Sequence, residues 1–420
     1  MSLASTNMNA SWSNGRGTRR GDVVRIALYS HDTQGLGHVR RNLLIASALA
    51  KRGLNPIVLL LSGVHEAAAF EMPAGVDCIT LPSLGKDDSG VYFPRSLGVG
   101  MKDLIGLRRR TLGAALRSFQ PDLFIVDKVP GGAFQELLPA LRTVRARKSA
   151  RIVLGWREIL DDAEEVERES HQQGWEKTIR DYYDRIWVYG DREVFDPVAE
   201  YNLAPDIAAK VRFTGYLNPL AAGGDAIDEP AADLMLPPGR LALCVVGGGR
   251  DGVPLAEAFI RAPMPASTNG VVITGPLMPA ADRARLRLLA AGRSRLRVLE
   301  FVTNPLPYLR QADCVISMAG YNTMCEVLAM KKKALIVPRT RPRLEQLIRA
   351  RRFAELGVVD MLHPDDLTPA ALAEWIDRSG ESRPVDAGID LGGYQRLPLL
   401  LDEVLSAGAA PCRERIRIAS

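Results

Sequence analysis

Hydrophobic and polar positions alternate along this chain between short apolar runs and stretches with helical spacing. Apolar runs with the length of buried strands occur at 23–29, 55–61, 122–126, 151–155 and 186–189. Between the first two runs, residues 42–51 carry apolar positions at helical spacing. Because strands and helices alternate, the pattern predicts a parallel sheet wrapped by helices.

The alternation pauses at 220–239, a stretch rich in Ala, Gly, Asp and Pro that is typical of a linker. Apolar runs resume at 241–246, 270–274, 296–299, 314–317 and 334–337. Two rounds of the same alternation predict an α/β fold with two Rossmann-like, doubly wound parallel-sheet domains. Ligands in such folds bind at the carboxyl ends of the strands, so we expect a site in the cleft where the two domains face each other.

The pattern divides the chain into five segments. They are a tail at 1–21, a first domain at 22–219, a linker at 220–239, a second domain at 240–370 and a helical segment at 371–420. The tail is rich in Ser, Asn, Gly and Arg without a central apolar run, so we expect it to be disordered and not a signal peptide. The last segment has helical spacing and could cap the second domain or cross back between the domains.

Composition narrows the class of protein. The 420 residues are 47% hydrophobic and 25% charged, which is ordinary for a globular protein of two domains. A formal net charge of +5 suits an anionic ligand or an acidic membrane surface, whereas 6% aromatic residues without a basic and aromatic platform argue against nucleic acid. Five cysteines without a Cys-x-x-Cys pair, and no run of roughly 20 apolar residues, predict a cytoplasmic protein with reduced thiols.

The most informative stretch for chemistry is 317–326, Ser-Met-Ala-Gly-Tyr-Asn-Thr-Met-Cys-Glu. It follows an apolar strand, and Gly320 leaves room for an anion at the start of a helix expected from Tyr321. The first amides of that helix lack internal partners and lie at the positive end of its dipole, so they could hold a diphosphate. Glu326, in the second turn, could accept both hydroxyls of a ribose. The alternative is a buried strand and a helix whose Glu is only solvated.

A glycine run follows the strand at 241–246. Gly247, Gly248 and Gly249 are consecutive and precede Arg250. Consecutive glycines can form a cradle of amides for a phosphate, but they can equally form a tight turn.

A basic stretch follows the strand at 334–337. Residues 339–352 hold a run of arginines around Glu345 and Gln346, and we expect a helix here with most of its charge on a solvated face. Glu345 and Gln346 fall early in this helix, on the side of the same cleft as Glu326. A carboxylate beside an amide could hold two adjacent sugar hydroxyls.

In the first half, the strand at 23–29 runs into a glycine loop that ends at His38. Gly35 and Gly37 let this loop approach a ligand at the start of the next helix. A dinucleotide-binding loop would carry a third glycine where this chain has Arg40, which argues against a nicotinamide oxidoreductase. His38 could take a proton from an acceptor hydroxyl or, when charged, hold phosphate; a structural histidine is the plain alternative.

Two further strand ends of the first half carry polar side chains. Lys128 and Arg157 are candidates for contact with an acceptor, and Asp161 is a reserve base. The alternative is an arginine–carboxylate pair that braces a loop.

Residues 101–119 mix Lys and Arg with Leu, Ile and Phe. This pattern could rest on an anionic lipid surface. A helix packed on the sheet just before the strand at 122–126 explains the same pattern, and we favour the helix.

Taken together, these residues resemble glycosyltransferases of the two-Rossmann (GT-B) type. The resemblance is greatest to the group that contains the peptidoglycan lipid-linked N-acetylglucosaminyltransferase, with its glycosyltransferase family 28-like C-terminal domain. That group carries Ser-x-Ser-Gly-x-x-Thr-x-x-Glu in its second half. This chain matches the pattern at Ser317, Gly320, Thr323 and Glu326, with Ala319 in place of the second Ser.

The resemblance implies a role for each domain. Residues 22–219 would bind the acceptor and residues 240–370 the nucleotide-sugar donor, with Gln346 at the donor sugar and Val302 at the base. The donor side would comprise Gly247, Gly248, Gly249, Arg250, Val302, Ser317, Gly320, Tyr321, Asn322, Thr323, Glu326, Glu345 and Gln346. The family's Gly-Gly-Thr-Gly-Gly-His is kept only in part, as Gly-Leu-Gly-His at 35–38. The acceptor side would comprise Gly35, Gly37, Lys128 and Arg157, with His38 or, failing it, Asp161 as the base.

The expected function is therefore sugar transfer from a nucleotide donor, a UDP-sugar by the resemblance, to a hydroxyl acceptor in one inverting displacement. No Asp-x-Asp motif stands at a strand end, so we expect no obligatory metal and no other cofactor. We expect a cytoplasmic protein, with peripheral contact to the inner face of a membrane left open. The rivals are a sugar-nucleotide epimerase of the same twin-domain fold, which needs several acids and bases around the sugar, a non-catalytic nucleotide-sugar binding scaffold and, last, a nicotinamide oxidoreductase.

Overall fold

The computed structural model describes residues 23–31, 37–50, 56–86, 91–223, 234–380 and 387–407. The expected tail at 1–21, the middle of the expected linker, Gly35 and Cys412 lie outside the described residues.

The first sheet has seven parallel strands in the order β3-β2-β1-β6-β7-β8-β9. Their bounds are β1 Arg25–Ser30, β2 Ile57–Ser62, β3 Val76–Thr80, β6 Leu123–Asp127, β7 Arg151–Arg157, β8 Arg185–Tyr189 and β9 Val211–Phe213. The order reverses between β1 and β6, which places the carboxyl ends of these two strands at a switch point of the sheet. A separate antiparallel pair joins β4 (Leu84–Lys86) to β5 (Tyr92–Pro94).

The second sheet has six parallel strands in the order β12-β11-β10-β13-β14-β15. Their bounds are β10 Arg240–Val245, β11 Thr268–Ile273, β12 Leu296–Leu299, β13 Cys314–Ser317, β14 Lys333–Ile336 and β15 Asp360–Met361. Here the order reverses between β10 and β13. The expected α/β architecture of two doubly wound parallel sheets is confirmed.

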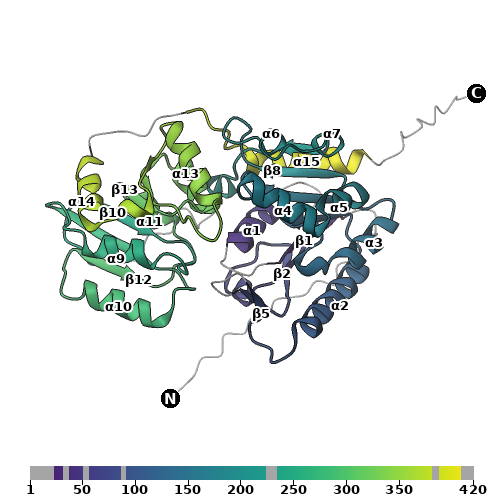
Figure 1. Cartoon of the computed structure of the whole chain (residues 1–420), viewed down its shortest axis with the longest axis horizontal. Helices are drawn as coiled ribbons and strands as arrows, with labels where there is room; N and C mark the ends of the chain where they lie inside the picture. Colours follow the sequence, from purple (N-terminus) through teal and green to yellow (C-terminus); the bar gives the residue numbers. More distant parts are fainter. Residues whose placement is uncertain are drawn as a thin grey trace, which may run out of the picture.

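Helices cover both faces of each sheet (Figure 1). Around the first sheet lie α1 (Gly37–Ala50), η1 (His65–Ala69), α2 (Met101–Phe119), η2 (Ala133–Gln135), α3 (Leu138–Ala146), α4 (Ala163–Gln173), α5 (Trp175–Tyr182), α6 (Pro197–Glu200), α7 (Pro205–Ala208) and η3 (Pro219–Ala222). Around the second lie α9 (Val253–Arg261), α10 (Ala280–Ala290), α11 (Leu306–Gln311), α12 (Tyr321–Ala329), α13 (Glu345–Glu355), η4 (Pro364–Asp366) and α14 (Pro369–Arg378).

Alternate residues of a strand point to opposite faces, and the cores follow this period. In β1, Ile26 and Leu28 join the core beneath α1, while Ala27 and Tyr29 join the core beneath α2 and α3. The first of these cores is continuous with the core of the second domain that contains α12 and α13. At the junction the ring of Tyr216 stacks on Tyr321 with centroids 6.0 Å apart.

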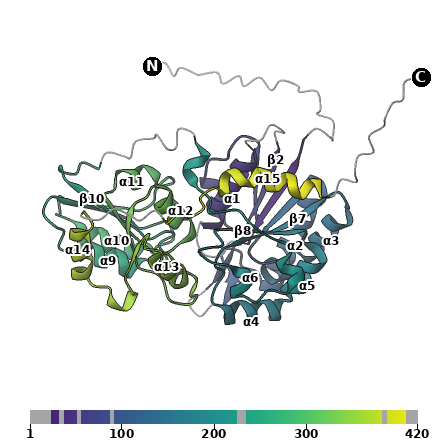
Figure 2. The same ribbon diagram turned by 90° about the horizontal axis from the view of Figure 1, so that it is seen from above.

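The last helix, α15 (Gly393–Ser406), returns to the first domain. It packs on α1, and the hydroxyl of its Tyr394 lies 3.0 Å from Ser47 Oγ. Figure 2 shows this yellow helix lying across the first lobe, whereas α14 stays on the second lobe. The domain limits themselves stay a prediction.

One element departs from its predicted bounds. The helix expected over 339–352 begins only at Glu345, so Arg339 and Arg343 lie in the loop before α13. Pro342 lies in that loop, and it has no amide hydrogen to donate within a helix, so the helix starts only after it.

Candidate functional site

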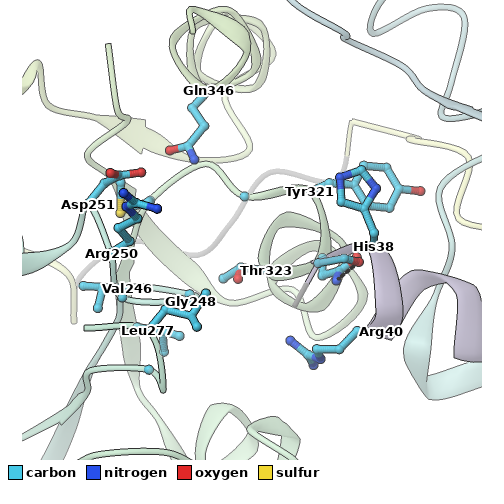
Figure 3. A pocket seen from close by; sticks show the side chains of 18 of the residues that line it. His38, Arg40, Val246, Gly248, Arg250, Asp251, Leu277, Tyr321, Thr323 and Gln346 are labelled. Atoms are coloured by element: carbon cyan, nitrogen blue, oxygen red, sulfur yellow. Dashed lines mark hydrogen bonds between the residues drawn. The ribbon is translucent and has the colours of Figure 1, made fainter. Parts of the chain in front are cut away.

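A cavity of about 310 Å³ lies between the two domains, where the carboxyl ends of both sheets face each other. Residues of α1, with Lys128 after β6 and Arg157 at the end of β7, line one side, and residues from the β10, β13 and α13 regions line the other. Figure 3 shows His38 and Arg40 entering from α1, opposite Arg250, Asp251 and Gln346. Of the predicted donor residues, all except Ser317 line this cavity.

The start of α12 faces the cavity without a cap. Gly320 is the N-cap residue, and within the described part of the chain no side-chain hydrogen bond caps the helix. A side-chain carbon added at Gly320 would meet no atom within 4 Å, so this position opens onto free space. These unpaired amides lie at the positive end of the helix dipole and form a place for an anion.

Glu326 lies one turn further along α12 and also lines the cavity. Its side chain is only 2% exposed, and its Oε1 forms an ion pair with Arg40 of α1. Among the described residues, its Oε2 has no hydrogen-bond partner. Burial raises the pKa of Glu326, and Arg40 opposes that rise. Burying a carboxylate oxygen without a hydrogen-bond partner costs free energy. Such an oxygen is therefore suited to accept a hydrogen bond from a ligand.

The glycine run after β10 has two different uses. Gly249 adopts a φ of +93°, and a side-chain carbon there would lie 2.0 Å from the carbonyl oxygen of Thr274. Gly249 is thus required by the turn. Gly247 also has a positive φ, of +62°, but a side-chain carbon there would meet nothing within 4 Å. Gly249 therefore makes the tight turn, and Gly247 presents open backbone to the cavity, while the cradle for a phosphate stays a prediction.

His38 is held by a carboxylate that was not among the predicted site residues. Its Nδ1 lies 2.5 Å from Asp127 Oδ2, at the end of β6. Arg41 Nη2 donates to both oxygens of Asp127, at 2.7 and 2.6 Å. Burial would raise the pKa of Asp127, but Arg41 and His38 together hold it well below its usual range. Asp127 is therefore ionised and favours the His38 tautomer that carries its proton on Nδ1 and leaves Nε2 unprotonated.

The signal for Asp127 was present in the sequence but needed the strand order. It ends an apolar run, as many residues do. Only the pairing of β6 with β1 brings that end beside the loop before α1.

Asp161, the predicted reserve base, does not line the cavity. It is 2% exposed, accepts from the backbone amide of Leu344 at 2.7 Å and pairs with Arg343 at 2.9 Å. Arg343 also pairs with Glu165 and Glu169 of α4. Asp161 thus joins the two domains, because Leu344 and Arg343 both belong to the second domain.

Arg157 and Lys128 line the cavity on the acceptor side, but their surroundings differ. Arg157 pairs with Glu345 at 2.5 Å across the domains, and Arg339 also pairs with Glu345 at 3.2 Å. Burial would raise the pKa of Glu345, but Arg157 and its other cationic neighbours lower it to about 2. Lys128 has a φ of +65°, and burial lowers the pKa of its ammonium group.

The structure places the remaining predicted residues in or near the cavity, with the following partners. Gly37 lines the cavity, and its carbonyl accepts from Asn322 Nδ2 at 3.0 Å. Gln346 Oε1 accepts from the amide of Arg339 at 3.1 Å. Val302 lines the cavity, while Ser317 lies fully buried behind it. Glu345 is engaged by arginines, so it does not stand free beside Gln346 for sugar hydroxyls.

No group of three or more His, Cys, Asp or Glu side chains that could hold a metal ion occurs within the described ranges. No helix among the described residues is long and apolar enough to cross a membrane.

Comparison with known proteins fits this geometry. Residues 243–385 match the model of the glycosyltransferase family 28 C-terminal domain. The second domain is therefore similar to the glycosyltransferase family 28 C-terminal domain. The matched stretch runs from within β10 through α14, so it contains the glycine run, α12 and the loop before α13.

Two curated relatives illustrate the likeness in sequence. Both are named UDP-N-acetylglucosamine--N-acetylmuramyl-(pentapeptide) pyrophosphoryl-undecaprenol N-acetylglucosamine transferase. The one from Geobacillus kaustophilus is 34% identical over 96 residues, which are 22% of this chain and 27% of the relative. The one from Ralstonia nicotianae is 31% identical over 162 residues, or 37% of this chain and 44% of the relative. The matches thus span less than half the length of these relatives.

Three solved structures share the GT-B fold along nearly the whole chain. Acinetobacter baumannii MurG has a TM-score of 0.54 at 16% identity, covering 90% of this chain and 99% of its own. The calicheamicin glycosyltransferase CalG4 has a TM-score of 0.54 at 17% identity, covering 92% and 95%. UDP-GlcNAc 2-epimerase from Neisseria meningitidis, bound to UDP-GlcNAc, has a TM-score of 0.58 at 13% identity, covering 91% and 100%. At such identities the likeness establishes the fold alone.

Proposed function

We propose that this protein is a glycosyltransferase that moves a sugar from a UDP-sugar donor to a hydroxyl acceptor, with inversion and without an obligatory metal. The observation that carries the proposal is the buried Glu326 carboxylate with one open oxygen, one turn beyond an uncapped helix start that faces the His38–Asp127 pair. The family 28 domain and the curated relatives, which are named as N-acetylglucosamine transferases, support the donor class.

The second domain binds the donor. The amides at the start of α12 take the diphosphate, and the ribose hydroxyls donate to the two oxygens of Glu326. The open backbone at Gly247 and the side chain of Gln346 face the donor sugar, and Val302 lies beside the base. Helix-end amides stabilise the charge that grows on the diphosphate as it leaves, so no metal is required for this step.

The first domain activates the acceptor. His38 Nε2 takes the proton of the acceptor hydroxyl while the hydroxyl oxygen forms a bond to C1 of the sugar. The bond from C1 to the diphosphate oxygen breaks, and its electron pair leaves with the diphosphate. Asp127 holds the imidazole in the tautomer that can accept this proton and stabilises the imidazolium that results. Asp161 is not needed as a base in this scheme.

The acceptor side of the cavity is basic. Gly37, Lys128 and Arg157 line it, and Gly35 stays a predicted member whose position lies outside the described residues. Arg157 is engaged in its ion pair with Glu345. Lys128 directly follows Asp127 and is therefore the cation that we assign to acceptor contact.

A surface next to this side suits peripheral contact with the inner face of a membrane, in a cytoplasmic protein. Exposed apolar side chains occur along residues 91–107 and at Phe134, namely Val91, Phe93, Leu97, Val99, Leu107 and Phe134, and Val91 and Phe134 line one hollow. Lys102, Arg109 and Arg110 of α2 border the hollow beside them. Apolar side chains within a basic rim favour an anionic lipid surface. Sedimentation with anionic and with neutral vesicles tests this, since binding to neither would contradict the contact.

Calorimetric titration with UDP tests the donor site. Glu326→Ala should weaken UDP binding about 10- to 100-fold, because hydrogen bonds to a charged group contribute about 1.5–3 kcal/mol. Glu326→Gln keeps the size of the side chain and should lose less. Unchanged affinity in Glu326→Ala would refute the assignment.

Product analysis separates transfer from the rival activity of the same fold. Incubation with UDP-N-acetylglucosamine alone should leave the sugar's configuration unchanged, whereas an epimerase would produce an isomer without any acceptor. Retention of the activity in EDTA is expected, and its loss would contradict the metal-independent scheme.

A further inference from the structure

Arg40 joins the two domains at the centre of the cavity. It comes from the first turn of α1, in the first domain, and its Nη2 pairs with Oε1 of Glu326 in the second domain. The Arg40 side chain is 29% exposed, whereas that of Glu326 is 2% exposed. Figure 3 shows Arg40 pointing into the cavity beside Thr323.

This pair occupies half of the proposed ribose site. If a ribose donates to both oxygens of Glu326, it competes with Arg40 for Oε1. Hydroxyls are neutral, so they replace the hydrogen bond of Arg40 without replacing its charge. The displaced guanidinium then stands in a cavity that already favours an anion, and it needs a new negative partner.

A diphosphate at the start of α12 would be within reach. Glu326 lies five residues beyond Tyr321, which is about 7.5 Å along the helix axis. The flexible stem of an arginine spans a similar length, so Arg40 can turn from the carboxylate to the phosphates without a movement of α1. A guanidinium can bind phosphate oxygens with two parallel hydrogen bonds.

Three other arginines that line the cavity are paired with carboxylates other than Glu326. Arg41 is fixed on Asp127. Arg157 and Arg339 are paired with Glu345. Arg40 differs, because its partner Glu326 is the residue proposed to bind the ribose. A bound donor would therefore change the surroundings of Arg40.

We propose that Arg40 is a donor-binding residue that the first domain contributes. Resting on the proposed function, the inference is that ribose displaces Arg40 from Glu326 and that its guanidinium then pairs with the donor diphosphate. The same movement places a positive charge where negative charge grows as the sugar leaves. Arg40 thus couples the contact between the domains to the presence of a nucleoside diphosphate.

The test compares UDP with uridine, which keeps the base and ribose but has no phosphate. Calorimetry is performed on the full chain and on Arg40→Met, which keeps the length of the side chain without its charge. Arg40→Met should weaken UDP binding about 10- to 100-fold and leave uridine binding unchanged or slightly stronger, since Glu326 is released. Arg40→Lys should recover part of the UDP affinity. Arg192→Met, which removes an exposed ion pair with Asp196 on the first domain, is the matched control and should bind both ligands normally.

Other results would overturn the inference. Equal UDP affinity in wild type and Arg40→Met means that Arg40 only braces the domains. Tighter binding of both ligands means that Arg40 only competes for Glu326. If Arg40→Met does not fold by circular dichroism, Arg40→Gln and Arg40→Lys are compared instead, and equal UDP affinity of these two variants overturns the inference. Failure of wild type to bind UDP would remove the proposed function itself, whereas normal UDP binding in wild type and Arg40→Met removes only the role of Arg40.

Discussion

The carboxylate of Asp127 binds both His38 and Arg41, and this arrangement fixes the protonation and orientation of the imidazole. Asp127 accepts from the imidazole and from Arg41, and it is 3% exposed. Arg41 in turn is enclosed by the rings of Tyr189 and Tyr321, at 5.9 and 5.6 Å from their centroids. The imidazole therefore has a fixed orientation before any substrate arrives, which lowers the cost of placing its Nε2 at an acceptor hydroxyl.

Loss of this pair should affect rate and not donor affinity. His38→Ala should lower kcat about 10²- to 10⁴-fold, because general base catalysis contributes about that much. Asp127→Asn should lower kcat substantially as well, since the amide can favour the wrong tautomer. Steady-state kinetics gives kcat, and calorimetry with UDP serves as the control. A large loss of UDP affinity with an unchanged kcat would contradict the assignment of His38 as base.

At the scale of residues, the sequence predicted site residues that lie in one short motif, but it did not predict pairs of residues that are far apart in the chain. Glu326 and the open start of α12 follow from ten consecutive residues, whose spacing decides both positions. Asp127 and the pairing of Arg40 with Glu326 depend on which strands and domains meet, and no spacing along the chain encodes that. Asp161 stays an untested prediction as a base, and the sequence could not show that it pairs with Arg343, because a carboxylate after a strand looks the same whether it faces a ligand or the other domain.

The helix α13 carries a buried ion pair that joins the second domain to the first. Its Arg349 is fully buried and donates to Glu158 Oε1 at 2.6 Å, just after β7. Arg349 also donates to the carbonyl of Ala319 at 2.9 Å, in the loop before α12. The same side chain thus positions the proposed diphosphate loop relative to the first domain.

Breaking this buried pair should be strongly destabilising. Arg349→Met leaves Glu158 as an uncompensated buried charge and should lower the free energy of unfolding by about 3–5 kcal/mol. The double variant Arg349→Met with Glu158→Gln should recover much of that loss, because no charge remains buried. Urea unfolding measures both. Lys177→Met, which removes an exposed pair with Asp181, should cost less than about 1 kcal/mol. An equally small effect of Arg349→Met would show that the pair does not hold the junction.

Long apolar runs predicted the central strands, and edge elements escaped them. The runs at 122–126 and 241–246 correspond to β6 and β10, which lie in the interior of their sheets. By contrast, β15 has two residues and β9 has three, too few for any periodicity to register. The start of α13 was misplaced because arginines that pair with acids in a loop resemble arginines on a solvated helix face.

The whole molecule is held together by charge as well as by a shared core. Arg343 joins Asp161, Glu165 and Glu169 across the domains, and Arg157 joins Glu345. Arg157, Arg343 and Glu345 of these pairs also line the cavity. In the proposed scheme, a donor that binds between the domains has to open the contact between Arg40 and Glu326.

Acidification should destabilise the protein in two stages. Burial lowers the pKa of His31 to about 3, so the stability from its neutral form is complete above its ordinary 6.5 and is lost as pH falls toward 3. The pKa of Glu345 is lowered to about 2, so its contribution, on the order of 3 kcal/mol, is complete above its ordinary 4.5 and is lost as pH falls toward 2. Urea unfolding at several pH values measures this. Glu345→Gln should flatten the lower stage, and a stability independent of pH between 7 and 3 would contradict both assignments.

The central claim is that the cavity between the domains receives a nucleoside diphosphate, and a crystal structure of the protein grown with UDP tests it most directly. The account predicts the diphosphate at the first amides of α12 and the ribose hydroxyls within hydrogen-bond distance of Glu326. UDP bound outside this cavity, or bound within it with Glu326 still on Arg40 and no ribose contact, would contradict it.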